Sequence, residues 1–295
     1  MTVALRPRSL AEAVRHLADD PALVPVAGGA DLMVRPLEAL HRLDRVIDLL
    51  AIPELRGIRE ADGGLEIGAT TPFTAIGRSP AVRAAFPALA AAAGQIGGWQ
   101  IQNRATLGGN MANASPAGDS LPVLLALDAV VVAAGPAGRR EIPYTAFHVG
   151  YRKTALQPGE IVAGVRLPFL PPGTVQAFRK VGTREAQAIS KVVVAMAGRL
   201  ADGRIADLRL AAGSVAATPV RLRAAEAAAV GLPPGPEAAD GADRAGRAAA
   251  GEVTPIDDVR STADYRRFAL ERVVRRMVLE LGGAERTRDA DHAQR

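Results

Sequence analysis

Two pairs of adjacent glycines are the residues whose type and spacing best fit ligand chemistry. The first pair, Gly28 and Gly29, lies in the segment 27–31, between an apolar run that predicts a strand and a stretch that predicts a helix. Glycine lets the backbone turn tightly and approach a ligand closely. The N–H groups that begin a helix suit a phosphate. A purely structural explanation also fits, in which the glycines end a strand and Asp31 caps a helix.

The second pair, Gly108 and Gly109, lies in the segment 106–110. Thr106 could donate a hydroxyl and Asn110 an amide, and Asp119 could accept hydrogen bonds from a ribose or an adenine. Long irregular loops inside compact domains are often functional, although a loop that only bridges two elements is the alternative. Neither glycine pair is a G-x-G-x-x-G motif or a P-loop. We expect both glycine pairs to leave their backbone amides free to bind one diphosphate. Two such segments in one chain therefore favour one elongated anionic dinucleotide, and FAD over NAD.

Hydrophobic periodicity predicts an N-terminal part that mixes helices and strands. Ser9 and Glu12 form a capping box before a helix, and Asp62-Gly63 marks the turn of a hairpin. The segment 94–119 has neither a helical nor a strand period. The predicted helices are 10–17, 32–40, 80–93 and 120–127, and the predicted strands are 23–26, 46–49, 57–59, 65–67, 130–133 and 160–169.

The pattern changes near residue 172, where we expect a domain boundary. Three β-like segments follow, and then Ala-rich helices that end in a long one at 262–281. The Pro/Gly/Ala-dense stretch 231–252 predicts a loop with a weak helix. We therefore expect domains at 1–172 and 173–282, and a disordered tail at 283–295. The three β-like segments are 174–182, 189–200 and 204–213.

Composition excludes several classes of protein. The chain has 295 residues and no cysteine, which rules out disulfides, thiolate nucleophiles and cysteine-ligated iron–sulfur clusters in this chain. The net charge is +5, but acidic residues are interspersed and aromatic residues are few, which argues against nucleic-acid binding. No apolar run approaches a membrane span or a secretory signal. We expect a cytoplasmic protein without a zinc site.

Several segments resemble the FAD-binding medium subunits of molybdopterin dehydrogenases, the carbon monoxide dehydrogenase and xanthine dehydrogenase type of molybdenum hydroxylase. Residues 27–32 (the first motif) are similar to the first FAD motif of that family, and the stretch 100–119, which contains residues 106–110 (the second motif), is similar to its second. Residues 178–184 are similar to the opening of its C-terminal domain, and 256–266 to its end. The resemblance covers about 1–282.

The resemblance implies an α+β fold: a two-lobed FAD-binding domain of the vanillyl-alcohol-oxidase (PCMH) type with a smaller C-terminal α+β domain. It implies that the two motifs wrap the pyrophosphate of FAD. Asp119 would hold the adenosine side, Asn113 would lie along the same loop, and Val162 would lie beside the flavin. Lys180 matches a basic position at the domain junction. The implied cofactor-binding residues are Ala27, Gly28, Gly29, Ala30, Asp31, Leu32, Thr106, Leu107, Gly108, Gly109, Asn110, Asn113, Asp119, Val162 and Lys180.

The sequence departs from the family pattern at Ala30, Gln102 and Ala105, where the family has a polar residue, Arg and Gly. Ala30 removes one hydroxyl donor for a phosphate. Of the other residues with chemical potential, a lone Trp such as Trp99 is more often a core residue than a flavin contact. Structural or surface roles are expected for Tyr144, His148 and Tyr151. Arg152 and Arg184 could line an acceptor or partner surface, or be solvated charges.

By this resemblance the chain is an electron-transfer oxidoreductase subunit with no catalytic acid–base pair. A large molybdopterin-binding subunit would oxidise the substrate, and a small iron–sulfur subunit would carry electrons to FAD here. The external acceptor would be NAD, oxygen or a quinone, and the complex a heterotrimer, often doubled. Two alternatives stay open: a stand-alone flavin oxidoreductase, and a non-catalytic assembly protein that has lost FAD.

Overall fold

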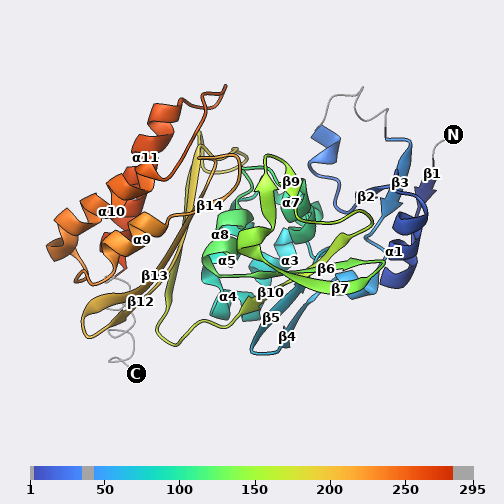
Figure 1. The fold of residues 1–295 in the computed structure, drawn as a ribbon, viewed down its shortest axis with the longest axis horizontal. Helices are drawn as coiled ribbons and strands as arrows, with labels where there is room; N and C mark the ends of the chain where they lie inside the picture. The colour runs from blue at the N-terminus through green and yellow to red at the C-terminus, as the bar shows by residue number, and fades with distance from the viewer. Residues whose placement is uncertain (1–2, 35–42, 282–295) are drawn as a thin grey trace.

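A small parallel sheet and one helix form the N-terminal lobe of the computed structural model, which describes residues 3–34 and 43–281 (Figure 1). The sheet has the strand order β1-β3-β2. Ser9 caps the helix as predicted, because its Oγ accepts from the Glu12 N–H at 3.2 Å. The buried side chains of this helix, Ala13 and Leu17, lie four residues apart and so share one face. The elements are β1 (Val3–Leu5), α1 (Leu10–Asp19), β2 (Val24–Val26) and β3 (Arg45–Asp48).

A five-stranded antiparallel sheet forms the central lobe, with the order β4-β5-β10-β6-β7. The hairpin predicted around Asp62-Gly63 is present, and both residues have positive φ, as a tight hairpin turn requires. The central strand β10 is almost entirely buried because it pairs with β5 on one side and β6 on the other. The strands are β4 (Ile58–Ala61), β5 (Gly64–Gly68), β6 (Val130–Gly135), β7 (Gly138–Pro143) and β10 (Ile161–Pro168).

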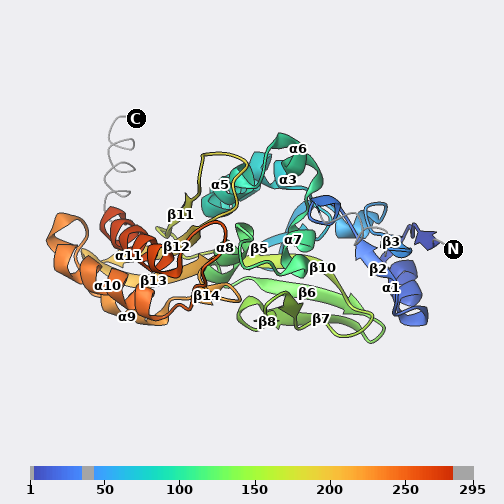
Figure 2. The same ribbon diagram turned by 90° about the horizontal axis from the view of Figure 1, so that it is seen from above.

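Short helices cover one side of this sheet (Figure 2). Their buried side chains, with Phe73, Phe86 and Leu89 among them, join the sheet in the central hydrophobic core. A small hairpin, formed by β8 (His148–Gly150) and β9 (Lys153–Thr154), follows the sheet strands β6 and β7. The helices are α3 (Phe73–Arg78), α4 (Pro80–Ala85), α5 (Pro87–Gln95), α6 (Trp99–Arg104), α7 (Leu107–Asn113) and α8 (Ser120–Ala126).

The C-terminal domain is an antiparallel sheet, ordered β11-β12-β13-β14, with three helices on one face and α5 and α8 against the other (Figure 1). Strand β12 is buried on both faces, so it reads as a continuous apolar run. Val193 and Ala195 point into the central core, whereas Val192 and Val194 point into the C-terminal core. The elements are β11 (Val175–Val181), β12 (Val192–Ala201), β13 (Arg204–Gly213), β14 (Val220–Arg221), α9 (Arg223–Ala229), α10 (Ala239–Gly251) and α11 (Ala263–Glu280).

Four of the predicted segments differ from the structure. The helix expected at 80–93 is two helices, because Phe86 has non-helical backbone angles and Pro87 starts a new helix. The segment 94–119, expected to be irregular, contains α6 and α7. The stretch 231–252, expected to be mostly loop, contains the thirteen-residue helix α10, whose buried side is made of glycine and alanine. Of the helix expected at 32–40, the structure describes a 3₁₀ turn at Leu32–Val34, and 35–40 lie outside the described residues.

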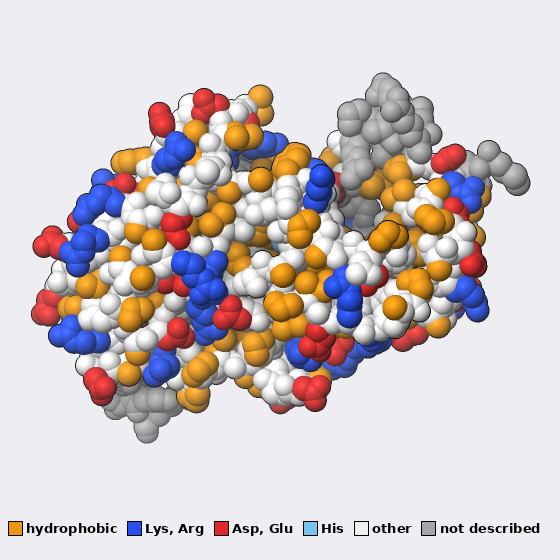
Figure 3. Space-filling view, in the orientation of Figure 1, with side chains coloured by type: hydrophobic (Ala, Val, Ile, Leu, Met, Phe, Trp, Pro, Cys, Tyr) orange, Lys and Arg blue, Asp and Glu red, His pale blue; other side chains and the backbone are white. Residues whose placement is uncertain are grey.

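Basic and acidic side chains alternate over the face shown in Figure 3, without a large field of one sign. No helix in residues 3–34 and 43–281 is long and apolar enough to cross a membrane.

Candidate functional site

The first motif contains a tight turn at residues 27–30. It follows β2, and Gly29 has φ +72°, a left-handed conformation that glycine adopts without strain. Among the described residues, the backbone N–H groups of Ala27, Gly28, Gly29 and Ala30 form no hydrogen bond. Consecutive N–H groups in such a turn form a concave site for an anion.

The first motif packs directly on the backbone of the chain just before the second motif. A Cβ at Gly28 would lie 1.7 Å from the carbonyl oxygen of Arg104, which is far inside van der Waals contact. Only glycine permits this approach. The two motifs, far apart in sequence, are therefore neighbours in the folded chain, as one shared ligand requires.

The second motif differs from the first because its backbone donors are already used. Leu107 N–H donates to Thr71 O at 3.2 Å, and Gly108 N–H donates to Ala69 O at 2.9 Å. Thr106 caps helix α7, since its Oγ1 accepts from Gly109 N–H at 3.2 Å. The expectation that both glycine pairs leave their amides bare is therefore right for 27–30 and wrong for Gly108 and Gly109. The second pair serves packing, because a Cβ at Gly108 would lie 2.5 Å from the Cβ of Ala69.

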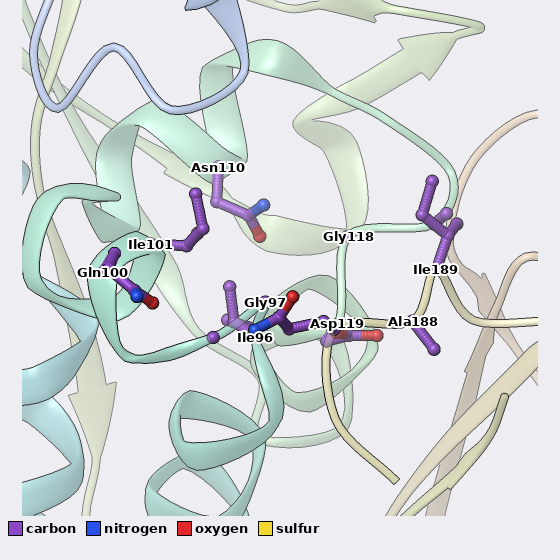
Figure 4. A pocket seen from close by; sticks show the side chains of 12 residues that line it. Ile96, Gly97, Gln100, Ile101, Asn110, Gly118, Asp119, Ala188 and Ile189 are labelled. Carbon is purple, nitrogen blue, oxygen red and sulfur yellow. The ribbon is translucent and has the colours of Figure 1, made fainter. Parts of the chain in front are cut away.

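A cleft of about 530 Å³ lies beside the second motif, at the junction between the central lobe and the C-terminal domain (Figure 4). One wall is the segment 96–101, the opposite wall is the segment 187–189, and Asn110 and Asp119 lie between them. Asn110 Oδ1 accepts from the Ser120 hydroxyl at 2.7 Å, and its side-chain N–H groups have no acceptor within the described chain.

Asp119 and Lys180 form a buried ion pair next to the cleft. Lys180 Nζ donates to Asp119 Oδ2 at 2.6 Å and to Gln95 O at 2.9 Å, and the exposed fractions of the two side chains are 8% for Asp119 and 4% for Lys180. The Ser190 hydroxyl donates to Asp119 Oδ1 at 2.5 Å. Burial raises the pKa of Asp119, and the neighbouring Lys180 opposes that rise. These hydrogen bonds join Asp119 of the central lobe to Lys180 of β11 and to Ser190, which follows the cleft-lining segment 187–189.

Two models of known families match this chain. Residues 1–170 match the FAD binding domain in molybdopterin dehydrogenase, and residues 176–281 match the CO dehydrogenase flavoprotein C-terminal domain. The chain belongs to this family of molybdopterin dehydrogenase flavoproteins. The predicted family, α+β fold class and FAD cofactor are confirmed.

Relatives of this flavoprotein match over nearly their whole lengths. The putative xanthine dehydrogenase FAD-binding subunit of Escherichia coli is 33% identical, with 93% of this chain and 94% of that protein aligned. The carbon monoxide dehydrogenase medium chain of Hydrogenophaga pseudoflava is 33% identical, with 92% and 93% aligned. A solved structure of carbon monoxide dehydrogenase from that organism superposes with a TM-score of 0.87 over 93% of this chain and 95% of the other. Quinoline 2-oxidoreductase from Pseudomonas putida superposes with a TM-score of 0.88 at 27% identity, with 96% and 98% covered.

The remaining candidates of the flavoprotein lie in different surroundings. Val162 is a buried residue of β10 and does not line the cleft. Asn113 Oδ1 accepts from Arg152 at 2.7 Å, at the end of α7. The expectation of a core position for Trp99 is wrong, because Trp99 starts α6 with 72% of its surface exposed, 5.7 Å from the guanidinium of Arg78. Tyr144 is buried, whereas Tyr151 is exposed.

Sequence reasoning missed three residues around the cleft. Ser190 and the carbonyl of Gln95 are partners of the Asp119–Lys180 pair, and no local pattern identifies either. Gln187 lies in the wall of the cleft, and its backbone N–H donates to Gly97 O at 3.3 Å. Gln102, where the family has Arg, donates from its side chain to Gly94 O at 2.9 Å and so stabilises the preceding loop.

Proposed function

We propose that this chain holds FAD between its two motifs and the interdomain cleft, as the electron-relay subunit of a molybdenum hydroxylase. The observation that carries the proposal is the turn 27–30, whose four backbone N–H groups form no hydrogen bond within residues 3–34 and 43–281, and whose Gly28 lies against the backbone of Arg104. A diphosphate needs several donors in a small space, and these amides fit that need. The relatives named as FAD-binding subunits and medium chains support the same function.

The residues of the chain would act by binding and orienting. The amides of residues 27–30 would donate to the diphosphate, with Asp31 and Leu32 completing the turn. Thr106, Leu107, Gly108, Gly109 and Asn113 would shape the floor beneath it, while the free N–H groups of Asn110 would face the cleft. Bound FAD supplies the redox chemistry, accepting and releasing electrons.

The Asp119–Lys180 pair would line the cleft as a neutral unit. Asp119 lies in the cleft and has lone pairs beyond those used by Ser190 and Lys180, so it can accept a hydrogen bond from the ligand. Val162 is buried in β10, and we propose that this apolar position lies beside the flavin.

We further propose the partners and the setting of this flavoprotein. A large molybdopterin-binding subunit would oxidise the substrate, and a small iron–sulfur subunit would pass electrons on, in a cytoplasmic heterotrimer, single or doubled. An external acceptor such as NAD, oxygen or a quinone would take the electrons. Residues 1–172 and 173–282 would be its two domains. The medium-chain names of relatives support a multi-subunit enzyme.

The test is FAD binding by the purified chain and by two matched glycine variants. Gly29 and Gly203 both have left-handed backbones, with φ of +72° and +69°, but Gly203 lies in a distant hairpin with nothing within 4 Å of its added Cβ. Gly29→Val and Gly203→Val therefore carry the same backbone strain. We expect Gly29→Val alone to lose the flavin absorbance, while both keep the far-UV circular dichroism of a folded chain.

Two results would contradict the proposal. A colourless wild-type chain that does not take up added FAD would indicate a protein that has lost the cofactor. Reduction of the flavin by an organic substrate, in the absence of any partner subunit, would indicate a stand-alone oxidoreductase.

A further inference from the structure

The hairpin formed by β8 and β9 is fastened to helix α7 of the second motif. His148 Nε2 lies 3.1 Å from Met111 O, within hydrogen-bond distance, and the N–H of Ala155 donates to Phe147 O at 2.8 Å. At the tip of the hairpin, Arg152 has φ +52°, a left-handed conformation that costs energy for a residue with a side chain. These contacts fix the place from which the Arg152 side chain extends.

That side chain reaches the ends of both motifs. Arg152 Nη1 donates to Asn113 Oδ1 at 2.7 Å, just behind the second motif, and lies 3.8 Å from Asp31 Oδ2 in the first motif. The guanidinium has five N–H donors. Apart from the contacts to Asn113 and Asp31, its donors have no acceptor among the described residues. With 42% of its surface exposed, the side chain is open to a ligand.

A bound diphosphate carries negative charge, which a side chain with a full positive charge would balance. The amides of Leu107, Gly108 and Gly109 are used within the protein, so these three residues offer no backbone donor to a phosphate. The amides of 27–30 carry only partial charge. Lys180 is held by Asp119 and Gln95 and is nearly buried. Arg152, in contrast, is a half-exposed cation whose side chain contacts Asn113 and lies 3.8 Å from Asp31.

From these contacts we infer that Arg152 is a positioning residue for FAD, whose guanidinium donates to the diphosphate and holds the two motifs together around it. The inference rests on the proposed function. Because Arg presents several N–H groups in a plane, it can keep its bond to Asn113 while donating to phosphate oxygens. The Asp31 carboxylate at 3.8 Å would then orient the guanidinium from the other side.

The test compares FAD binding by the full-length, FAD-stripped wild-type chain with binding by Arg152→Met, Arg152→Lys and Lys153→Met. Lys153 is the neighbouring, exposed cation on the same hairpin, so its variant controls for the loss of one positive charge. Flavin fluorescence gives Kd for FAD and for riboflavin, which lacks the diphosphate, at several salt concentrations.

We expect Arg152→Met to weaken FAD binding by about tenfold to a hundredfold, the range for a hydrogen bond to a charged group. Its Kd should depend less on salt than that of the wild type, and riboflavin affinity should not change. The Kd of Arg152→Lys for FAD should lie between those of the wild type and Arg152→Met, and the Kd of Lys153→Met should match that of the wild type.

Three results would overturn the inference. The first is an unchanged Kd for FAD in Arg152→Met, and the second is an equal loss of FAD affinity in Lys153→Met. The third is an equal loss of affinity for FAD and for riboflavin in Arg152→Met, which would indicate that Arg152 has only a structural role. If Arg152→Met does not fold, Arg152→Lys decides by the same comparison. A wild-type chain that binds no FAD would instead overturn the proposed function.

Discussion

Replacing Lys180 with Met tests whether the Asp119–Lys180 pair is a buried charge pair that holds the two domains together. Both side chains are less than 10% exposed, so Lys180→Met would leave the Asp119 carboxylate in the same surroundings with only the Ser190 hydroxyl as a donor. Removing one partner of a buried ion pair costs about 3–5 kcal/mol. For a chain of this size we expect the melting temperature to fall by at least about 6 °C.

The loss should depend on pH in a direction that the structure determines. Burial already raises the pKa of Asp119 above its ordinary value of 3.8, and Lys180 opposes the rise. Without Lys180 the folded-state pKa rises further, so the folded chain binds a proton that the unfolded chain has released. Stability relative to the wild type is therefore retained at low pH and lost as pH rises through the folded-state pKa. The deficit should be largest near neutral pH.

Thermal unfolding of the FAD-free chains, followed by circular dichroism between pH 5 and pH 8, measures both effects. The double variant Asp119→Asn with Lys180→Met removes both charges and should recover most of the lost stability. Arg179→Met is the matched control, because Arg179 is the adjacent residue on β11 but forms an exposed pair with Glu280, worth less than about 1 kcal/mol. A Lys180→Met variant as stable as the wild type at pH 7 would refute the reasoning.

Two further variants test the close approach of the motifs and the burial of His148. Gly28→Ala would place a Cβ 1.7 Å from the Arg104 carbonyl oxygen, so we expect loss of FAD binding and a destabilisation of about 2 kcal/mol or more. Flavin absorbance and the melting temperature measure the two effects. The control is Gly251→Ala, which should change neither, because nothing lies within 4 Å of its added Cβ. Unchanged FAD content in Gly28→Ala would contradict the packing. Burial lowers the pKa of His148 below 6.5, so its contribution to stability is present above pH 6.5 and is lost as pH falls below that value. His148→Phe should therefore lose less stability than the wild type between pH 7.5 and pH 5.5; an equal loss in both would show that His148 is not the group that titrates.

The sequence predicted the parts of the site that depend on local chain geometry. The strand and turn around Gly28 and Gly29 follow from residue types within a few positions, and so does the cap of α1 by Ser9. The sequence predicted mostly loop where helix α10 lies. The buried face of this helix consists of Gly and Ala, which give little hydrophobic contrast along the sequence. Trp99 was misjudged because a general preference for burial says nothing about which side of a short helix meets the core.

Pairings across the fold could not be predicted in the same way. The protein partners of Asp119 are Lys180 and Ser190, which come from strand β11 and the loop after it, and no spacing in the sequence pointed to either pairing. The amides of Gly108 and Gly109 were expected to be free, but the carbonyl of Ala69, at the end of β5, takes the first and the Thr106 side chain takes the second. Such partners are set by tertiary packing, which a single sequence does not encode in any spacing.

The proposed site therefore draws on both parts of the chain, although each motif lies before residue 172. The C-terminal domain contributes Lys180 and Ser190 to the buried network and residues 187–189 to the wall of the cleft. A chain that ended before β11 would leave the Asp119 carboxylate without either donor and the cleft with one wall. Because β12 directs alternate side chains into two cores, the same cut would also expose the central core that Val193 and Ala195 help to close. The residues after 172 would thus be part of the proposed cofactor site as well as of a separate hydrophobic core.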